Sequence, residues 1–171
     1  EWYEAVGTVR SRTEAQISAQ ITGRIVKILV RPGDKVQKGE VLIELDGREF
    51  RARVDQAQQG LQAAKARRDQ AKQGLIAAQA AYAESEANYK RIKSFFEQEA
   101  ATRRDLEQAE ASFKQAKAGV RQAKEGMAGA EAGVRQAQKV VEEARVALGY
   151  AKVNAPEAGE VAKRLAEPGD L

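Results

Sequence analysis

The sequence predicts an α+β protein: a small β sandwich formed from two sequence-distant halves and interrupted by a long antiparallel α-helical coiled-coil hairpin. Three observations predict it. A segment rich in Val and Ile, punctuated by Gly and Pro, begins the chain, and a related segment ends it. From Gly47 to Lys152 the chain contains no proline and consists mostly of strong helix formers. An apolar stripe with heptad spacing runs through that stretch.

Residues 1–46 are expected to form the first half of the β domain, together with a leading strand. The segments "ITGRIVKILV" and "KGEVLIELD" have the composition of short strands. Between them, "RPGDKV" indicates a turn, since Pro32 presets φ and Gly33 supplies a permissive backbone.

Residues 47–152 are expected to form two long helices that pack along one apolar seam. Alternating steps of four and three residues meet an apolar side chain at almost every position, and larger residues alternate with alanine. A heptad pattern sustained over so many repeats is typical of a coiled coil, and small residues favour close packing of two antiparallel helices. The expected seam includes Leu61, Leu75, Tyr82, Tyr89, Phe113, Val120, Met127 and Val134.

A slip of three residues in the stripe, just beyond Phe96, indicates that the helices are separated by a turn. Thr102 is suited to cap the second helix, with Asp105 three residues later as in a capping box. The expected ranges are 47–96 for helix 1, 97–101 for the tip and 102–150 for helix 2.

Residues 153–171 repeat the beginning of the chain at an offset of 136 positions. Each copy is too small to bury an apolar face by itself, so the copies are expected to pair. Pairing brings residues 46 and 153 together, and the helical stretch must therefore double back. The second copy is expected to be incomplete. The turn residues that match between the copies are Gly23, Pro32, Gly33 and Asp34 with Gly159, Pro168, Gly169 and Asp170.

The pattern G-x-[IV]-x-K followed by PGD-x-V-x-KG-x-x-L-x-x-LD resembles the biotinyl/lipoyl fold. Split by a helical hairpin, it is similar to the periplasmic adaptor family, also called membrane fusion proteins, of tripartite efflux and type I secretion systems. The resemblance covers nearly the whole chain. It implies a hexameric ring that links an inner-membrane pump, of the resistance–nodulation–division type, to a TolC-type outer-membrane channel. An adaptor of an ABC-type exporter or type I secretion system is the alternative.

The same resemblance implies a location in the periplasm of a Gram-negative bacterium, with membrane contact and an inner-membrane anchor supplied by segments outside this fragment. Members that dock on such channels carry an Arg near the hairpin tip, a Leu after three residues and a Ser after six more. The stretch "RIKSFFEQEAAT" places Arg91, Phe95 and Thr102 at those spacings. The resemblance therefore implies channel docking by these three residues. Each also has a structural reading: a solvated charge, a packing residue and a helix cap.

Glycines recur on the helices at heptad spacing, namely Gly119, Gly126 and Gly133, with Gly60 and Gly74 two heptads apart. Glycine inside a helix costs about 0.5–1 kcal/mol relative to alanine. One hypothesis is that neighbouring hairpins or the partner helix come close there. Drift combined with flexibility is the alternative.

An enzyme is not expected, because the chain contains neither His nor Cys and its carboxylates lie on helix faces. No catalytic, cofactor-binding or metal-ligating residue is predicted. The net charge of +4 comes from positive and negative residues that interleave along the helices, which favours solvated faces over a nucleic-acid partner.

Two further classes remain as alternatives. A lipoyl or biotinyl carrier would modify a lysine in the hairpin between the halves, which the helices replace here; Lys27 and Lys163 lie within the strand pattern instead. A cytoplasmic coiled-coil scaffold would explain the helices and leave the split repeat unexplained.

Overall fold

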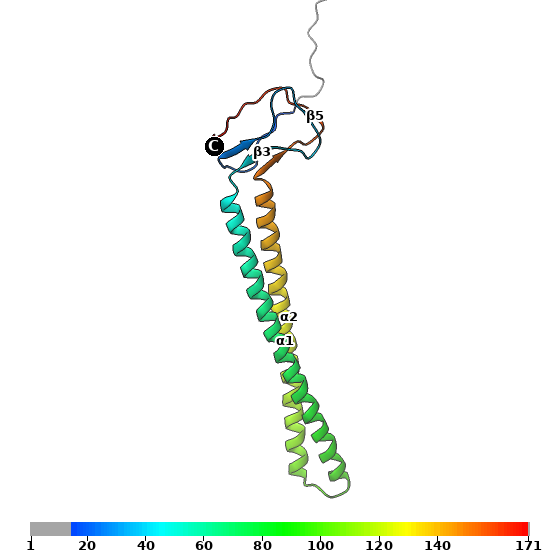
Figure 1. Ribbon diagram of the computed structural model, residues 1–171. Helices are drawn as coiled ribbons and strands as arrows, with labels where there is room; N and C mark the ends of the chain where they lie inside the picture. The colour runs from blue at the N-terminus through cyan, green and yellow to red at the C-terminus, as the bar shows by residue number, and fades with distance from the viewer. Residues whose placement is uncertain (1–14, 171) are drawn as a thin grey trace, which may run out of the picture. The chain divides into compact units, whose positions relative to one another are not determined.

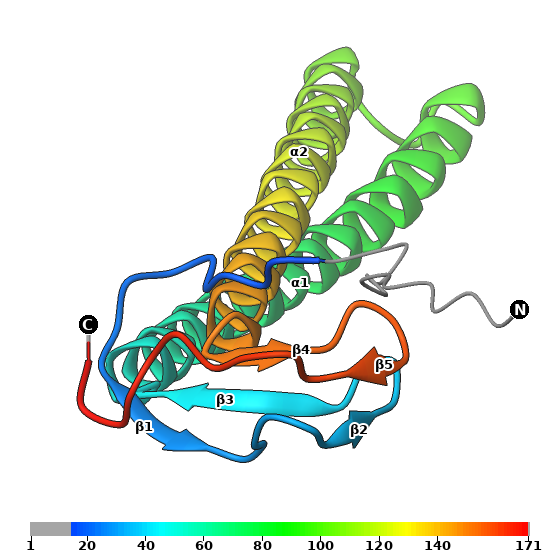
Figure 2. The same ribbon diagram turned by 90° about the horizontal axis from the view of Figure 1, so that it is seen from above.

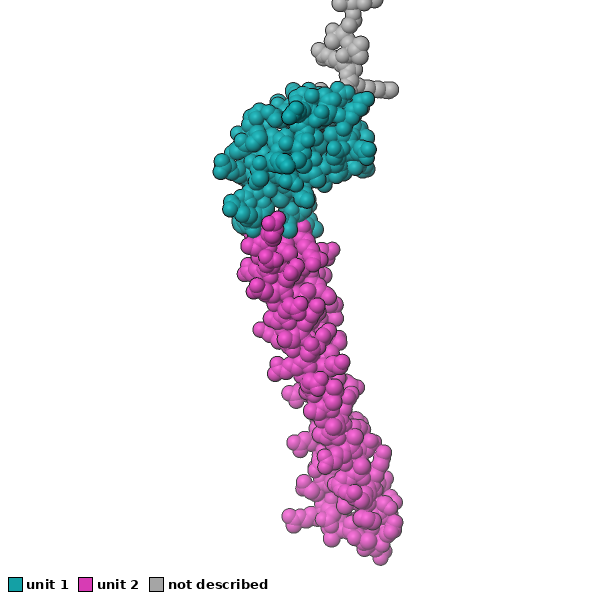
Figure 3. All heavy atoms as spheres, viewed as in Figure 1, with its two compact units in different colours: residues 1–50, 146–171 teal, residues 51–145 magenta. Residues whose placement is uncertain are grey.

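The computed structural model describes residues 15–170, which fold into two compact units (Figure 3). Within the described range, the β unit comprises residues 15–50 and 146–170, and the helical unit comprises residues 51–145. The expected leading strand falls largely before residue 15, outside the described residues, and residues 15–24 contain no strand. The elements in order are β1 (Ile25–Ile28), β2 (Lys35–Val36), β3 (Val41–Leu45), α1 (Arg48–Glu97), α2 (Arg103–Gly149), β4 (Lys152–Asn154) and β5 (Gly159–Glu160).

The β unit contains strands from both ends of the chain, paired with one another (Figure 2). Its three-stranded antiparallel sheet has the order β1-β3-β4, and a second sheet pairs β2 with β5. Ile43 of β3 lies opposite Val153 of β4, so the strand before the helices pairs directly with the strand after them. The predicted assembly of the β domain from two distant halves is confirmed.

The two copies of the repeated sequence form the same kind of turn, at residues 31–34 and 167–170. Gly33 and Gly169 both have positive φ, 92° and 104°, at the third position of their turns, where a proline precedes them as in a type II turn. Asp34 Oδ2 accepts a hydrogen bond from the N–H of Arg31 at 2.7 Å. Asp170 Oδ2 accepts the equivalent bond from the N–H of Glu167 at 2.8 Å. The same local sequence therefore produces the same backbone turn twice.

Each of these turns binds the strand segment of the opposite half. The N–H of Gly33 donates to the carbonyl of Val161 at 2.8 Å, and the N–H of Val161 donates to the carbonyl of Asp34 at 2.9 Å. The second turn repeats this exchange, because Gly169 donates to Ile25 and Ile25 donates to Asp170, both at 2.9 Å. The two halves are thus related by an approximate two-fold symmetry and interlock.

The core of the β unit is small and draws on both halves. Ile25, Leu45 and Ala151 are buried against one another, and partly buried apolar residues surround them. Gly47 lies where the chain leaves β3 for α1. A Cβ there would lie 3.3 Å from Ala151 Cβ and from Leu148 Cδ1, so the passage is too narrow for a larger residue without a shift of its neighbours.

In the helical unit, α1 and α2 form an antiparallel hairpin (Figure 1). Val54, Ala109, Val134 and Val141 are buried, and they lie on the expected heptad stripe. Other members of the expected seam are half-buried, namely Leu61, Leu75, Tyr82, Tyr89, Phe113, Val120 and Met127. Neither helix, within the part of the chain that the structure describes, has an apolar stretch sufficient to cross a bilayer.

Candidate functional site: the hairpin tip

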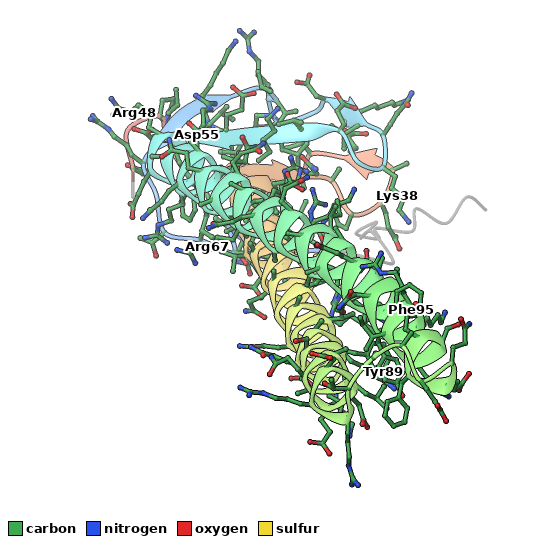
Figure 4. The ribbon with its side chains drawn as sticks, turned by 90° about the horizontal axis from the view of Figure 1, so that it is seen from below. Lys38, Arg48, Asp55, Arg67, Tyr89 and Phe95 are labelled. Atoms are coloured by element: carbon green, nitrogen blue, oxygen red, sulfur yellow. The ribbon has the colours of Figure 1, made fainter. Side chains whose placement is uncertain are left out.

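The hairpin tip, residues 91–105, begins in the last turns of α1 and ends in the first turn of α2. Arg91 and Phe95 lie on α1, and Thr102 directly precedes α2. The side chain of Phe95 is 44% exposed. Figure 4 labels Phe95 and Tyr89 at this end of the hairpin. All three residues implied in docking therefore lie within one short region, which contains the chain reversal between α1 and α2.

Beneath the tip, three aromatic rings join the two helices. The ring of Phe113 on α2 lies 5.4 Å, centroid to centroid, from both Tyr82 and Tyr89 on α1. It is stacked on Tyr89 with an interplanar angle of 10° and tilted by 37° against Tyr82. Such contacts contribute about 0.5–1.5 kcal/mol beyond burial of the rings. They hold the helices together a few turns before the chain reverses.

Beyond these rings the helices diverge toward the turn, as Figures 1 and 2 both show. The heptad stripe placed Phe96 in the seam, but its side chain is 37% exposed. That expectation was wrong because the helix ends separate before the reversal, so the last seam position faces solvent in part. Two adjacent phenylalanines are consequently open to solvent at the tip.

The turn after α1 is a Schellman motif closed by an unusual residue. The N–H of Ala100 donates to the carbonyl of Phe95 at 2.7 Å, and the N–H of Glu99 donates to the carbonyl of Phe96 at 3.0 Å. These are the two bonds that define the motif. Glu99 has φ of 59°, and it is the one non-glycine residue with positive φ in the described range. Glycine is the usual residue at this position.

Thr102 caps α2 through a reciprocal capping box, as expected. Its hydroxyl donates to Asp105 Oδ2 at 2.6 Å and accepts from the N–H of Asp105 at 3.2 Å. Its own N–H donates to the same carboxylate oxygen at 3.0 Å. These bonds lower the pKa of Asp105 below its ordinary value, because the hydroxyl and the N–H of Thr102 both donate to the ionised carboxylate. The hydroxyl of Thr102 thus has a structural task at the start of α2.

Arg91 presents a charge that no carboxylate of the described residues neutralises. Its Nη2 donates to Asn88 Oδ1 at 2.7 Å, one turn earlier on α1. A neutral amide satisfies one donor and leaves the cation uncompensated. Arg91 and Phe95 are four residues apart on one helix and therefore share a face.

The heptad-spaced glycines have open space around them. A Cβ built at Gly60, Gly74, Gly119, Gly126 or Gly133 would meet nothing within 4 Å. The hypothesis that the partner helix comes close at these positions is therefore wrong for the helices of this hairpin. A close approach by neighbouring hairpins stays a prediction.

Other surface features of the described chain lie away from the tip. A shallow depression on α1 is lined by Asp55, Gln58, Gln59 and Gln62, all from one helix face. Across residues 15–170, no three Asp or Glu side chains are grouped so that they could hold a metal ion. Lys27 on β1 and Lys163 are both exposed, and Lys163 lies outside any strand, contrary to the pattern that placed it within one.

The interlocked β halves and the inserted hairpin together define a class of protein, the membrane fusion proteins. The family described as "RND MFP, barrel-sandwich hybrid domain" matches residues 13–171. MFP stands for membrane fusion protein and RND for resistance–nodulation–division. The chain belongs to this family, whose members act as adaptors of efflux and secretion systems.

Curated relatives match parts of the chain. A "36 kDa antigen" of Helicobacter pylori (strain J99) is 29% identical over 113 residues, covering 59% of this chain and 34% of that protein. The pyoverdine export membrane fusion protein PvdR of Pseudomonas aeruginosa is 34% identical over 61 residues, covering 36% of this chain and 16% of that protein. The chain thus spans about a third or less of the length of these curated relatives.

Among solved structures, the chain is similar to MacA from Actinobacillus actinomycetemcomitans. The sequence identity is 28% and the TM-score is 0.61, with 94% of this chain and 45% of that chain covered. The likeness extends over both the β unit and the helical unit.

Proposed function

We propose that this chain is the hairpin-bearing part of a periplasmic adaptor that links an inner-membrane pump of the resistance–nodulation–division type to a TolC-type outer-membrane channel. In this proposal the hairpin tip docks on the channel. The family description names RND systems, which supports the pump class. The name of the Pseudomonas relative refers to export, which supports a role in transport.

The observation that carries the docking proposal is the exposure of Phe95. Phe95 lies outside the heptad seam in the last turn of α1, and it is 44% exposed. Burying a phenylalanine side chain contributes about 1.5–3 kcal/mol relative to leaving it in water. A partner that covers this ring would recover part of that free energy.

Arg91 supplies the polar part of the same surface. It is exposed one turn before Phe95 and forms no ion pair in the described chain. A cation beside a phenyl ring fits a partner that presents a carboxylate or helix C-terminus next to an apolar groove. Single contacts of this size are weak, and a hexameric ring of hairpins would raise the avidity because several tips engage together.

The proposal is tested with the full-length protein and the purified outer-membrane channel of its host, by biolayer interferometry in detergent. Arg91→Ala and Phe95→Ala are each expected to weaken binding about five- to thirtyfold, the range of a truncated interface contact worth about 1–2 kcal/mol. Ile76→Ala is the matched control, because Ile76 is 49% exposed on α1 away from the tip. Equal binding by all three variants and the unmodified protein would overturn tip docking.

Thr102 requires a separate comparison, because its cap role is independent of docking. Thr102→Ser retains a capping hydroxyl, and Thr102→Ala removes it at a cost of about 1 kcal/mol in stability. If Thr102 contacts the channel through its methyl group, Thr102→Ser weakens binding without lowering the melting temperature. If it only caps α2, Thr102→Ser leaves both quantities unchanged.

A further inference from the structure

The C-terminal end of α1 combines features that each disfavour the folded hairpin. Glu99 holds a left-handed backbone, with φ of 59°, that costs a side-chain-bearing residue more than glycine. Glu97 ends the helix, and the last turn contains no basic residue. The helix dipole favours cations at this end and disfavours carboxylates. The local sequence is therefore not arranged for the stability of the hairpin itself.

The rest of the described chain does not compensate these carboxylates. Within residues 15–170, Glu97 and Glu99 enter no ion pair and no side-chain hydrogen bond. Arg103, at the start of α2, pairs with Glu107 at 3.0 Å, and Arg91 binds Asn88. Two of the four basic residues of the tip thus bind other partners, and the other two, Lys93 and Arg104, form no ion pair with either carboxylate.

An apolar side chain is exposed beside the same carboxylates. Phe96 is 37% exposed where the heptad pattern would have buried it, and it directly precedes Glu97. Positions at which several local rules fail together are expected to be functional, because the loss in stability must be offset by another gain. The end of α1 therefore presents two carboxylates and a partly exposed phenyl ring within four consecutive residues.

We propose that Glu99 and Phe96 form a second docking contact of the tip, which recognises a cationic, apolar-lined surface of the outer-membrane channel. A lysine or arginine of the channel pairs with the Glu99 carboxylate, and the Phe96 ring packs against the apolar part of that surface. This inference rests on the proposed function, and it adds a contact of opposite sign to the one that Arg91 makes.

Charge complementarity selects a protein surface of this kind over a membrane. The tip, residues 91–105, carries the carboxylates of Glu97, Glu99 and Asp105 among the cations of Arg91, Lys93, Arg103 and Arg104. Charges of both signs match a protein surface that also carries both signs, whereas a lipid surface presents mainly anionic headgroups. A tip that carries a cation at Arg91 and an anion at Glu99 also restricts the orientation in which it docks, because a rotated partner would bring like charges together.

The test measures binding of the full-length protein to the purified channel of its host by biolayer interferometry. Glu99→Gln keeps the size of the side chain and removes its charge, and it is expected to weaken binding about three- to tenfold at low ionic strength, with a smaller difference at high ionic strength. Glu84→Gln, at an exposed position on the shaft of α1, removes the same charge away from the tip and is expected to have no effect.

A carbodiimide coupling experiment identifies the partner group. The reagent joins a carboxylate to an amine only when the two are in contact, so Glu99 is expected to form an amide with a lysine of the channel, located by mass spectrometry after digestion. In the Glu99→Gln variant this crosslink is expected to disappear, and in the Glu84→Gln variant it is expected to remain. If the channel's cation is an arginine, no amide forms. In that case the loss of affinity in Glu99→Gln, relative to the unmodified protein, decides whether Glu99 contacts the channel.

The variant Glu99→Gly distinguishes the contact of the Glu99 side chain with the channel from the backbone strain at this position. This variant relieves the left-handed conformation, so it is expected to melt at a higher temperature and still to bind the channel more weakly. Full affinity in both Glu99→Gln and Glu99→Gly, with Phe95→Ala still impaired, would overturn the second contact and leave tip docking intact. Absence of any binding by the unmodified protein would overturn both.

Discussion

At the scale of single residues, the three left-handed positions Gly33, Gly169 and Glu99 differ in the conformational cost of that backbone. Gly33 and Gly169 adopt positive φ in their turns without a steric penalty, because they lack a Cβ. Glu99 adopts φ of 59° at the helix end and bears the penalty. A glycine substitution can therefore stabilise the turn at the tip, whereas the two repeated turns already have glycine at the left-handed position.

Replacing Glu99 with glycine is expected to stabilise the protein by about 0.5–1 kcal/mol, because glycine reaches the left-handed region without strain. Urea denaturation followed by circular dichroism at 222 nm measures the free energy of unfolding. Gln98→Gly is the control. Gln98 has no positive φ, so glycine there only adds freedom to the unfolded chain and is expected to destabilise. A destabilised Glu99→Gly variant would contradict the assignment of strain.

Asp46 is the residue whose ionisation couples most clearly to folding. Its carboxylate accepts from the N–H of Arg48 at 3.1 Å and from Arg48 Nη2 at 2.7 Å. The side-chain hydrogen bond from Arg48 is the largest of the causes that lower the pKa of Asp46 from 3.8 to about 2. A lowered pKa means that the folded state holds the proton less tightly than the unfolded state does.

The stabilisation by Asp46 is therefore present above pH 4 and is expected to disappear as the pH falls from about 4 to about 2. Melting temperatures of the unmodified protein and of Asp46→Asn, recorded between pH 2 and pH 6, check this. The difference between them is expected to shrink over that window. Asp55→Asn, at an exposed position of α1, controls for loss of a carboxyl group. A constant difference across the window would contradict the linkage.

At the scale of elements, the helices are specified by their period and ended by their caps. The seam positions are buried or half-buried from Val54 to Ile92 on α1 and from Leu106 to Leu148 on α2. The capping box of Thr102 and Asp105 begins α2, and the Schellman turn ends α1. Between these ends, the glycines of the helices have no packing role within the hairpin.

The triple replacement of Gly119, Gly126 and Gly133 by alanine is expected to stabilise the hairpin by about 1.5–3 kcal/mol in total, since each glycine contributes about 0.5–1 kcal/mol. Nothing lies within 4 Å of the added methyl groups. Thermal unfolding measures the gain. Gly47→Ala is the contrasting control, because its Cβ would lie 3.3 Å from two side-chain atoms and is expected to destabilise. Loss of stability in the triple variant would show that these positions are covered.

Assembly of the triple variant addresses the remaining part of the glycine hypothesis. If neighbouring hairpins pack closely along these positions, the more stable triple variant is expected to assemble less well in sedimentation velocity experiments. Unchanged assembly would end the close-approach hypothesis for neighbouring copies as well.

At the scale of the whole molecule, the β unit depends on residues separated by the entire hairpin. Its core joins Ile25 and Leu45 to Ala151, and its turns exchange hydrogen bonds across the approximate two-fold axis. Neither half contains enough apolar surface to fold independently. Folding of the β unit must therefore wait until the helices have brought the two halves together, or must itself close the loop between them.

A disulfide between the halves tests this arrangement. Glu44 and Lys152 are direct cross-strand partners of β3 and β4, and such pairs have Cα separations compatible with a disulfide. The chain has no native cysteine, so the variant Glu44→Cys/Lys152→Cys is expected to form one intramolecular bond. It closes a loop of about a hundred residues and is expected to raise stability by about 3–5 kcal/mol. Oxidation to covalent dimers alone would mean that the halves pair between molecules.

Most of the architecture could be predicted from the sequence, because it depends on periodic or repeated signals. The heptad stripe, the repeated PGD turn and the Thr102–Asp105 spacing are all local patterns. The left-handed conformation of Glu99 could not be predicted, because only a glycine or asparagine would have signalled it. The exposure of Phe96 was missed for a related reason: a heptad pattern specifies which face a residue occupies, but not where the partner helix departs from it.

The sequence by itself determined the local structure of this protein and the pairing of its halves, since a β half-unit with an apolar face and no core of its own leaves few ways to fold. Only the tertiary structure decided what is exposed at the tip. The aromatic rings farther down the hairpin hold the two helices together, and the helix ends separate beyond those rings. Exposure of the tip residues depends on this separation, which no local pattern of residues encodes.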